Sequence, residues 1–168
     1  MNPSIPEWVR HPVQAIADAI NRTPARSHEP VAAAESETVL RARVLCVDDN
    51  PQVLRLLKRQ LEARYDVGIA QTAQDALALL KEGAAFDVII SDLRMPDVHG
   101  LTFLKMAREL YPHTERIILT GLPDPTTMSV ARNASGAEQL ILKPWTRNDL
   151  ALAVENAVRR RRESLTGE

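Results

Sequence analysis

The chain has 168 residues, which is enough for one domain with modest extensions. Apolar residues make up 45% of it but aromatic residues only 4%, so aliphatic side chains and alanine must form the core. The formal net charge of −1 gives no overall field that would attract nucleic acid, so we expect no direct nucleic-acid binding. The single cysteine, Cys46, excludes a framework of internal disulfides, and its apolar neighbours predict a buried thiol.

The amino-terminal residues carry no sign of export or membrane insertion. Glu7, Arg10 and Asp18 interrupt the stretch where a signal peptide would need an apolar core. No run approaches the ~20 apolar residues that a membrane-spanning helix needs. We therefore expect a cytoplasmic protein without membrane contact.

Residues 1–42 differ from the rest of the chain, since they hold five of its 11 prolines. Residues 12–22 could form a short helix with proline in the first turn and one apolar face, and a flexible linker would follow. An isolated helix of this length is marginally stable in water. We therefore expect an N-terminal extension that is either a docking or dimerisation segment or an unstructured tail.

From residue 43 onward, short apolar runs alternate with amphipathic stretches. The pattern predicts strands at 44–47, 67–70, 87–91, 116–120 and 139–142. Each strand is followed by a predicted helix, and the helices begin near residues 50, 72, 101, 126 and 146. Asn50 and Pro51 are typical of a helix start, and Thr72 and Thr146 each begin a sequence that resembles a capping box. Such alternation favours an α/β domain with a parallel sheet covered by helices on both faces.

Polar side chains stand where four of the predicted strands end. They are Asp48 and Asp49 after the first strand, Asp92 after the third, Thr120 at the end of the fourth and Lys143 after the fifth. In an open parallel sheet the carboxyl ends of the strands meet at one edge, and ligands bind there. We therefore expect these five side chains to form one site.

Three crowded carboxylates repel one another unless some are protonated or a cation neutralises them. Oxygen ligands of this kind suit Mg²⁺, which also binds phosphate oxygens. The ammonium of Lys143 and the hydroxyl of Thr120 could contact other phosphate oxygens, and the most exposed carboxylate would act as nucleophile. The assembly therefore favours phosphoryl transfer to an aspartate.

The same residues resemble the motif set of response-regulator receiver domains of bacterial two-component systems. The resemblance covers residues 43–162 and rests on Asp48-Asp49, the run from Ser91 to Gly100, Leu119-Thr120-Gly121, and Leu142-Lys143-Pro144-Trp145. It implies a flavodoxin-like (βα)5 fold with a doubly wound sheet of strand order 2-1-3-4-5. Residues 1–42 would then precede the receiver domain and residues 163–168 would form a tail, giving a stand-alone receiver without an output domain.

The resemblance also implies roles for individual residues. Asp92 would accept the phosphoryl group, while Lys143 would pair with it and Thr120 would turn towards it. Mg²⁺ would be held by Asp49 and Asp92, by Asp48 partly through water, and by the backbone carbonyl of Arg94. The bond between Lys143 and Pro144 would be cis.

The expected partners follow from the same resemblance. A histidine kinase or phosphotransfer protein would donate the phosphoryl group. The fourth helix, fifth strand and fifth helix of the domain would present the switched surface to a downstream protein or to a second copy of the chain. The chain would assist its own phosphorylation and dephosphorylation without being a turnover enzyme.

Leu140 departs from the family pattern, because an aromatic residue usually stands three positions before the lysine. It could be a core residue or mark a weakened switch, and it motivates an alternative in which the chain is a phosphorylation-independent binding or dimerisation module. An enzyme that binds a nucleotide or flavin on a similar sheet is disfavoured, since no glycine-rich loop follows the first strand.

Four consecutive arginines, Arg159 to Arg162, stand at the predicted end of the last helix. The simplest interpretation is a solvated helix end where positive charge is favoured by the helix dipole. Contact with an acidic partner is the alternative.

Overall fold

The computed structural model describes residues 40–83, 85–96, 98–121 and 125–167. The expected helix over residues 12–22 and the linker after it lie outside the described residues. No helix among those described is long and apolar enough to cross a membrane.

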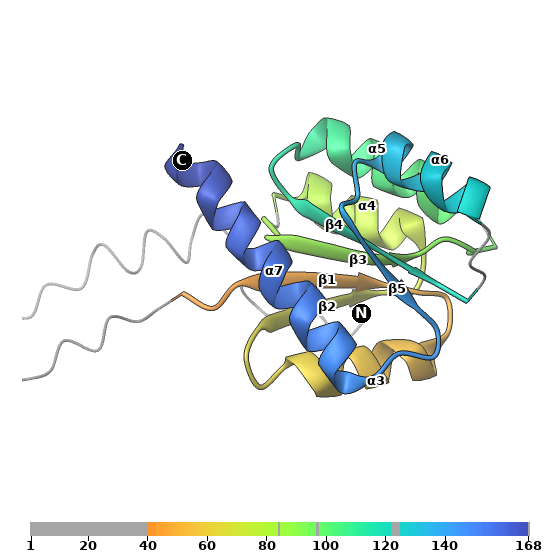
Figure 1. The fold of residues 1–168 in the computed structure, drawn as a ribbon, viewed down its shortest axis with the longest axis horizontal. Coiled ribbons are helices and arrows are strands. Elements are labelled where there is room, and N and C mark those ends of the chain that lie inside the picture. Colours follow the sequence, from red (N-terminus) through yellow and green to blue (C-terminus); the bar gives the residue numbers. More distant parts are fainter. Residues whose placement is uncertain (1–39, 84, 97, 122–124, 168) are drawn as a thin grey trace, which may run out of the picture.

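Five parallel strands form one sheet in the order β2-β1-β3-β4-β5, as predicted (Figure 1). The strands are β1 (Arg43–Val47), β2 (Asp66–Ala70), β3 (Val88–Asp92), β4 (Glu115–Thr120) and β5 (Gln139–Leu142). The helices are α3 (Pro51–Leu61), α4 (Ala73–Lys81), α5 (Gly100–Leu110), α6 (Pro125–Ser135) and α7 (Arg147–Thr166). The flavodoxin-like doubly wound fold is thereby confirmed.

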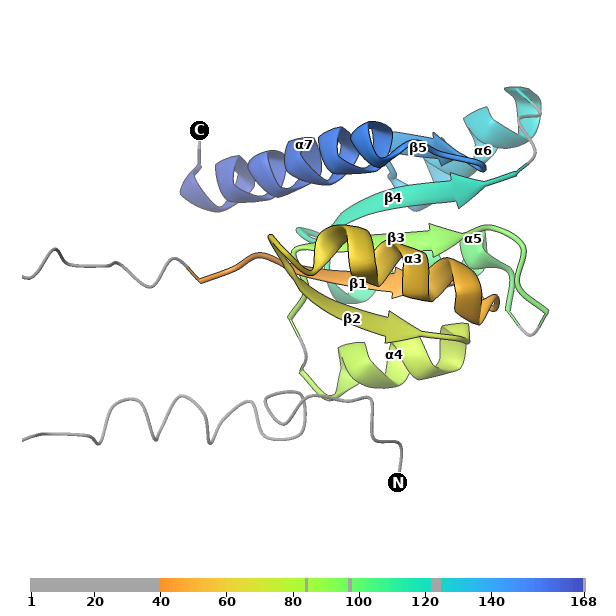
Figure 2. The ribbon, with the colours of Figure 1, turned by 90° about the horizontal axis from the view of Figure 1, so that it is seen from below.

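Helices cover the sheet on both faces, and each face has its own apolar core (Figures 1 and 2). The core between the sheet and α4, α5 and α6 includes Leu45, Ile89 and Phe103, all fully buried. The core between the sheet and α3 and α7 includes Cys46, Leu57 and Val154, also fully buried. Adjacent residues of a strand point to opposite faces, so the continuous apolar runs in the sequence serve both cores.

The predicted helix starts are confirmed by their caps. The side chain of Asn50 accepts a hydrogen bond from the backbone N–H of Gln52, and Pro51 begins α3. Thr146 and Asp149 form a reciprocal capping box at the start of α7. Thr72 accepts from the N–H of the residue three positions later, which is the first half of such a box. These caps fix where α3, α4 and α7 begin after the polar edge of the sheet.

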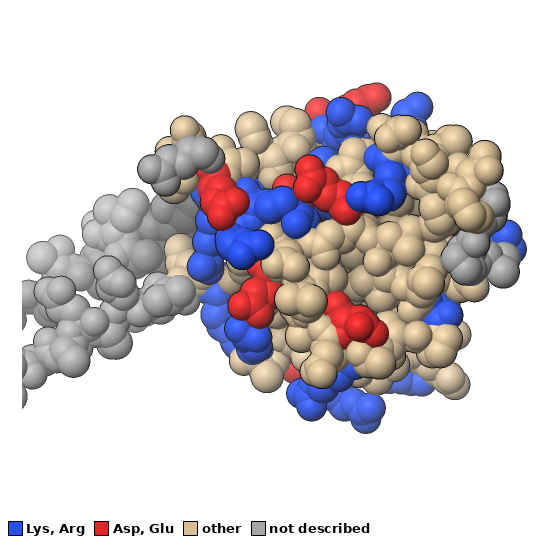
Figure 3. Space-filling model, in the orientation of Figure 1, with Lys and Arg blue, Asp and Glu red and all other residues tan. Residues whose placement is uncertain are grey.

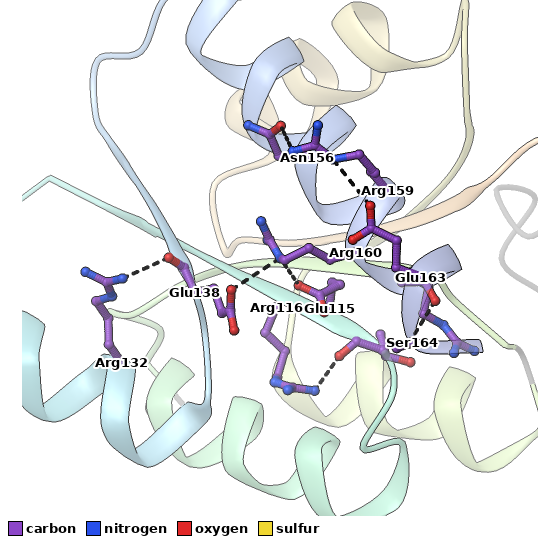
Figure 4. A network of polar contacts seen from close by, with 11 residues as sticks. Glu115, Arg116, Arg132, Glu138, Asn156, Arg159, Arg160, Glu163 and Ser164 are labelled. Carbon is purple, nitrogen blue, oxygen red and sulfur yellow. Dashed lines mark hydrogen bonds and ion pairs between the residues drawn. The ribbon is translucent and has the colours of Figure 1, made fainter. Parts of the chain in front are cut away.

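The interpretation of the arginine run as the solvated end of the last helix is wrong. The helix continues to Thr166, and no basic residue lies in its last turn. Figure 3 shows acidic and basic side chains interleaved over the face that α7 crosses, towards its C-terminus. Arg160 lies against the amino ends of the strands, where its Nε is 2.9 Å from Glu115 and 3.4 Å from Glu138 (Figure 4). The second and third arginines of the run, Arg160 and Arg161, are thus half-buried, because α7 passes beyond the amino edge of the sheet (Figure 1).

Candidate functional site

The carboxyl ends of β1, β3, β4 and β5 bring the predicted site residues together. Asp92 and Thr120 are the last residues of β3 and β4, while Asp48 and Lys143 directly follow β1 and β5. Carboxylate oxygens of Asp48, Asp49 and Asp92 all lie within 4.8 Å of one another. The structure therefore places these side chains at one edge of the sheet, as the alternation of strands and helices implied.

Lys143 directly follows β5, an edge strand of the sheet, and its side chain reaches the carboxylates. Its Nζ is 2.7 Å from Oδ2 of Asp48 and 3.3 Å from Oδ1 of Asp92. Its backbone N–H donates to the carbonyl of Thr120 at 2.7 Å, which extends the pairing of β4 with β5 by one residue. The Lys143–Pro144 peptide is cis, as the family resemblance implied. Lys143 is therefore held beside the carboxylates by both its side chain and its backbone.

Asp48 has both carboxylate oxygens engaged within the protein. Oδ1 accepts the backbone N–H of Asn50, and Oδ2 accepts the ammonium of Lys143. Asp49 is exposed, and no hydrogen bond of its side chain is found within the described part of the chain. An incoming cation would therefore find Asp49 free for direct contact, while Asp48 would be available mainly through water.

The expectation that the most exposed carboxylate is the nucleophile does not agree with the structure. Asp49 is exposed, whereas the side chain of Asp92 is only 9% exposed. Asp92 ends a central strand that is covered on both sides, but Asp49 lies beyond the end of β1, in the loop before α3. Exposure thus does not single out Asp92, and the prediction that it is the acceptor depends on the motif in which it stands.

Burial raises the pKa of Asp92, and the charges of Asp48 and Asp49 raise it further, although Lys143 opposes them. Burial alone would lower the pKa of Lys143, but its hydrogen bond to Asp48 and the charges of Asp48 and Asp92 outweigh this effect and raise it. The lysine therefore stays charged and the site carries three carboxylates against one ammonium. This surplus of negative charge favours the binding of a cation.

The donor set fits Mg²⁺. Three carboxylates that converge within 4.8 Å supply hard oxygen ligands, which this ion prefers, and no sulfur or imidazole ligand joins the cluster from the described residues. The side chain of Arg94 is exposed, so any contribution of this residue through its backbone carbonyl stays a prediction.

Two contacts at the site were not foreseen from the sequence. A Cβ atom on Gly100 would lie 1.8 Å from the carbonyl oxygen of Asp92, so α5 begins in direct contact with the backbone of β3. The indole N–H of Trp145 donates to Oε1 of Gln60 at 3.0 Å and ties the loop after Lys143 to α3. Gly100 and Trp145 both belong to the motifs quoted above, but their contacts depend on how the chain folds: Asp92 is the last residue of β3, and Gln60 lies on α3, 85 positions from Trp145.

Two further predictions concern Cys46 and Leu140. Cys46 is fully buried, as expected, and burial together with the charge of Asp48 raises the pKa of its thiol to about 12. Leu140 is partly buried and packs against the core beneath α4, α5 and α6. This packing favours the interpretation of Leu140 as a core residue.

Comparison with known proteins agrees with this geometry. The family model described as the response regulator receiver domain matches residues 44–155. The chain belongs to the response-regulator receiver family. The signal receiver domain of an HD domain-containing protein from Pseudomonas fluorescens superposes with a TM-score of 0.70 and 32% identity, over 73% of this chain and 98% of that one. The chemotaxis response regulator CheY4 of Vibrio cholerae gives 0.63 and 33%, over 69% and 98%.

Among curated proteins, the receiver is similar to parts of longer regulators. The hydrogenase transcriptional regulatory protein HoxA of Cupriavidus necator is 38% identical over 117 residues, which are 70% of this chain and 24% of that protein. The transcriptional regulatory protein TrcR of Mycobacterium tuberculosis is 34% identical over 119 residues, 70% of this chain and 46% of that protein. The chain thus spans between about a quarter and a half of the length of these relatives, and the likeness is confined to the receiver.

Proposed function

We propose that this receiver accepts a phosphoryl group on Asp92 from a histidine kinase or phosphotransfer protein in a Mg²⁺-dependent reaction. The observation that supports the proposal most is the convergence of Asp48, Asp49, Asp92 and Lys143 at one edge of the sheet. A carboxylate oxygen of Asp92 would attack the phosphorus, the bond between phosphorus and the donor's imidazole nitrogen would break, and an aspartyl phosphate would form.

The residues around Asp92 have separate tasks in this proposal. Asp49, Asp92 and the backbone carbonyl of Arg94 would hold the magnesium ion, and Asp48 would do so partly through water. When bound, the ion supplies positive charge to the oxygens of the transferring group. Lys143 lies 3.3 Å from Asp92 and would exchange part of its contact with the carboxylates for a phosphoryl oxygen. Thr120 would donate its hydroxyl to another phosphoryl oxygen.

The downstream surface would be formed by α6, β5 and α7. A hollow of about 380 Å³ beside β5 and α7 is lined by Leu140, Leu142 and Leu152, among others. Leu142 is 44% exposed and Leu152 62%, and Figure 3 shows uncharged side chains over this part of the face. Apolar surface of this kind suits a protein partner or a second copy of the chain. Because the proposed donor depends on ATP, we place the reaction in the cytoplasm.

The decisive experiment is incubation with Mg²⁺ and acetyl phosphate, followed by mass spectrometry of the intact chain and of its peptides. We expect one phosphoryl adduct, on Asp92, that is lost in Asp92→Asn and when EDTA removes the metal. Asp75→Asn, which removes an exposed carboxylate on α4, is the matched control and should keep the adduct. An adduct that survives Asp92→Asn, or none in the wild type, would refute the proposal.

A second candidate function, phosphorylation-independent binding, is favoured by one observation. Leu140 packs against the core where the family usually has a mobile aromatic residue, so the aromatic switch residue of the family is missing. Beryllofluoride, a stable phosphoryl mimic, separates the two candidates. Unchanged self-association and partner affinity in its presence would favour the second candidate.

A further inference from the structure

A second hollow lies on the face of the sheet that α4, α5 and α6 cover, opposite the face covered by α7. It occupies about 620 Å³ between α5 and α6 and the turn that leads into β5. Pro125, Met128 and Ala137 contribute apolar surface to it, and Arg108 and Arg132 contribute positive charge. None of the carboxylates of the phosphorylation site lines this groove, so its occupant does not depend on the function proposed above.

The side chain of Arg108 packs against the turn between α6 and β5. Gly136 in this turn has a φ of 64°, a left-handed conformation that glycine adopts without strain. A Cβ atom there would lie 3.2 Å from Nε of Arg108 and 3.3 Å from its Cδ and Cζ. The absent side chain thus lets the guanidinium lie directly on the backbone, where it forms part of the groove.

Two further arginines hold the same turn through backbone carbonyls. Arg116 is buried, and its guanidinium donates to the carbonyls of Ser135 and Thr114. Arg132 donates to the carbonyl of Glu138 at 3.0 Å (Figure 4). Within the described residues, no carboxylate lies within 4 Å of Arg108, Arg116 or Arg132.

Among the described residues that line the groove, the only carboxylate belongs to Glu138. It pairs with Arg160 on α7 at 3.4 Å, as Figure 4 shows, and not with Arg108 or Arg132. Burial lowers the pKa of Arg116, and the neighbouring charge of Arg108 lowers it as well, against the opposing effect of Glu115 and Glu138. Arg108 and Arg132 therefore have no carboxylate partner among the described residues, and they place positive charge beside an apolar surface.

We propose that the groove between α5 and α6 binds an acidic peptide segment of a partner protein, with carboxylates on Arg108 and Arg132 and an apolar side chain on Met128 and Pro125. Arginine forms charge-assisted hydrogen bonds with carboxylates, and arginine-rich pockets with an apolar centre are typical of protein interfaces. A phosphate backbone would leave the apolar surface uncovered, and the net charge of −1 disfavours a polyanion.

The test is an NMR titration of the ¹⁵N-labelled full chain, without phosphorylation, using a synthetic peptide of Glu-Glu-Leu repeats up to about 1 mM. We expect shifts confined to α5, α6 and residues 135–138. The double variant Arg108→Gln, Arg132→Gln should weaken binding at least about tenfold, since it removes two charge-assisted contacts. Arg116 is kept, because its removal would leave buried carbonyls unpaired and disturb the fold.

A matched control removes the same charge from the opposite side of the sheet. Arg55→Gln with Arg59→Gln, on exposed positions of α3, should change the affinity less than about twofold. Shifts spread over the whole surface, an equal loss in the control, or no shift at the highest peptide concentration would overturn the proposal. Tighter binding of a DNA duplex at the same residues would replace the peptide with nucleic acid and also overturn it.

Discussion

The ammonium of Lys143 lies 2.7 Å from a carboxylate oxygen of Asp48, and these two residues are 95 positions apart in the chain. The side chain of Asp48 is 1% exposed and that of Lys143 is 25% exposed, so the aspartate is shielded from solvent while the lysine stays partly in contact with it. The same ammonium is 3.3 Å from Asp92. The ammonium of Lys143 thus links the ends of β1, β3 and β5 and offsets part of the repulsion among the carboxylates.

Replacing this lysine should weaken the fold and strengthen cation binding at the same time. In Lys143→Met, Asp48 loses its charged partner, and we expect a loss of about 1–2 kcal/mol, below the usual cost of a broken buried pair because Lys143 is partly exposed. Removing a positive charge beside Asp92 should also tighten Mg²⁺ binding. Urea denaturation with and without Mg²⁺ measures both effects, and the gap to the wild type should shrink when Mg²⁺ is added.

Lys105→Met is the control for this experiment, since Lys105 is exposed on α5. It should change the unfolding free energy by less than about 0.5 kcal/mol, with or without Mg²⁺. A Lys143→Met penalty that Mg²⁺ leaves untouched would mean that the ion and the lysine do not act on the same carboxylates.

The charge on Asp92 should cost stability at neutral pH. Burial raises its pKa above the ordinary value of 3.8, so the folded state binds the proton more tightly than the unfolded state. Stability therefore falls as pH rises from the unfolded to the folded pKa and stays reduced above it. Asp92→Asn lacks this charge, and we expect it to be more stable than the wild type at about pH 7, with a gain that shrinks as the pH approaches 3.8.

Urea denaturation in metal-free buffer between about pH 4 and pH 8 measures this pH dependence. Asp75→Asn removes the same charge from an exposed position on α4 and should show no comparable gain. An Asp92→Asn variant that is less stable than the wild type across the whole range would contradict the assignment of burial as the dominant effect.

The sequence was sufficient for the fold and for the positions of Asp48, Asp92 and Lys143, because strand ends are local features and parallel topology brings them to one edge. It was insufficient for Arg160, whose partners Glu115 and Glu138 are contributed by β4 and the residue before β5. The run of arginines looked like a solvated helix end, since nothing in the local sequence shows that α7 continues beside the sheet. Exposure of individual carboxylates depends on the same tertiary packing and was misjudged for Asp92.

Gly100 should be intolerant of even a methyl group. In Gly100→Ala the added Cβ would lie 1.8 Å from the carbonyl oxygen of Asp92, so the backbone must move. Replacing glycine by alanine in a helix raises the free energy of unfolding by about 0.5–1 kcal/mol. Overpacking of this severity lowers it by at least about 2 kcal/mol, so we expect net destabilisation. Phosphorylation by acetyl phosphate should slow as well, because Asp92 shares the displaced backbone.

Gly121→Ala is the control for this variant. There the nearest atom to an added Cβ is Cβ of Lys143 at 3.9 Å, an ordinary contact, so the unfolding free energy should change by less than about 0.5 kcal/mol. Phosphorylation should also keep its wild-type rate, because an ordinary contact at this position leaves the backbone of Asp92 in place. Equal stability of the two variants in urea would contradict the close contact between Gly100 and Asp92.

The arginine run on α7 offers a comparison between neighbours. The Nε of Arg160 is 2.9 Å from Oε2 of Glu115, and its side chain is 25% exposed, whereas that of Arg159 is 67% exposed and lies 3.9 Å from Glu163. A charge-assisted bond in a partly buried setting contributes about 1 kcal/mol, while an exposed pair one turn apart contributes less than about 0.5 kcal/mol. Arg160→Gln should therefore lower the unfolding free energy clearly and Arg159→Gln hardly at all.

Urea denaturation of both variants at low salt and at about 0.5 M NaCl checks the reason for this difference, since salt screens exposed pairs more than buried ones. The penalty of Arg160→Gln should largely persist in salt, and a double-mutant cycle with Glu115→Gln should show coupling between the two positions. If Arg160→Gln and Arg159→Gln are equally mild, α7 is held by its apolar face alone, and the contact with the amino edge of the sheet adds nothing to the stability of the domain.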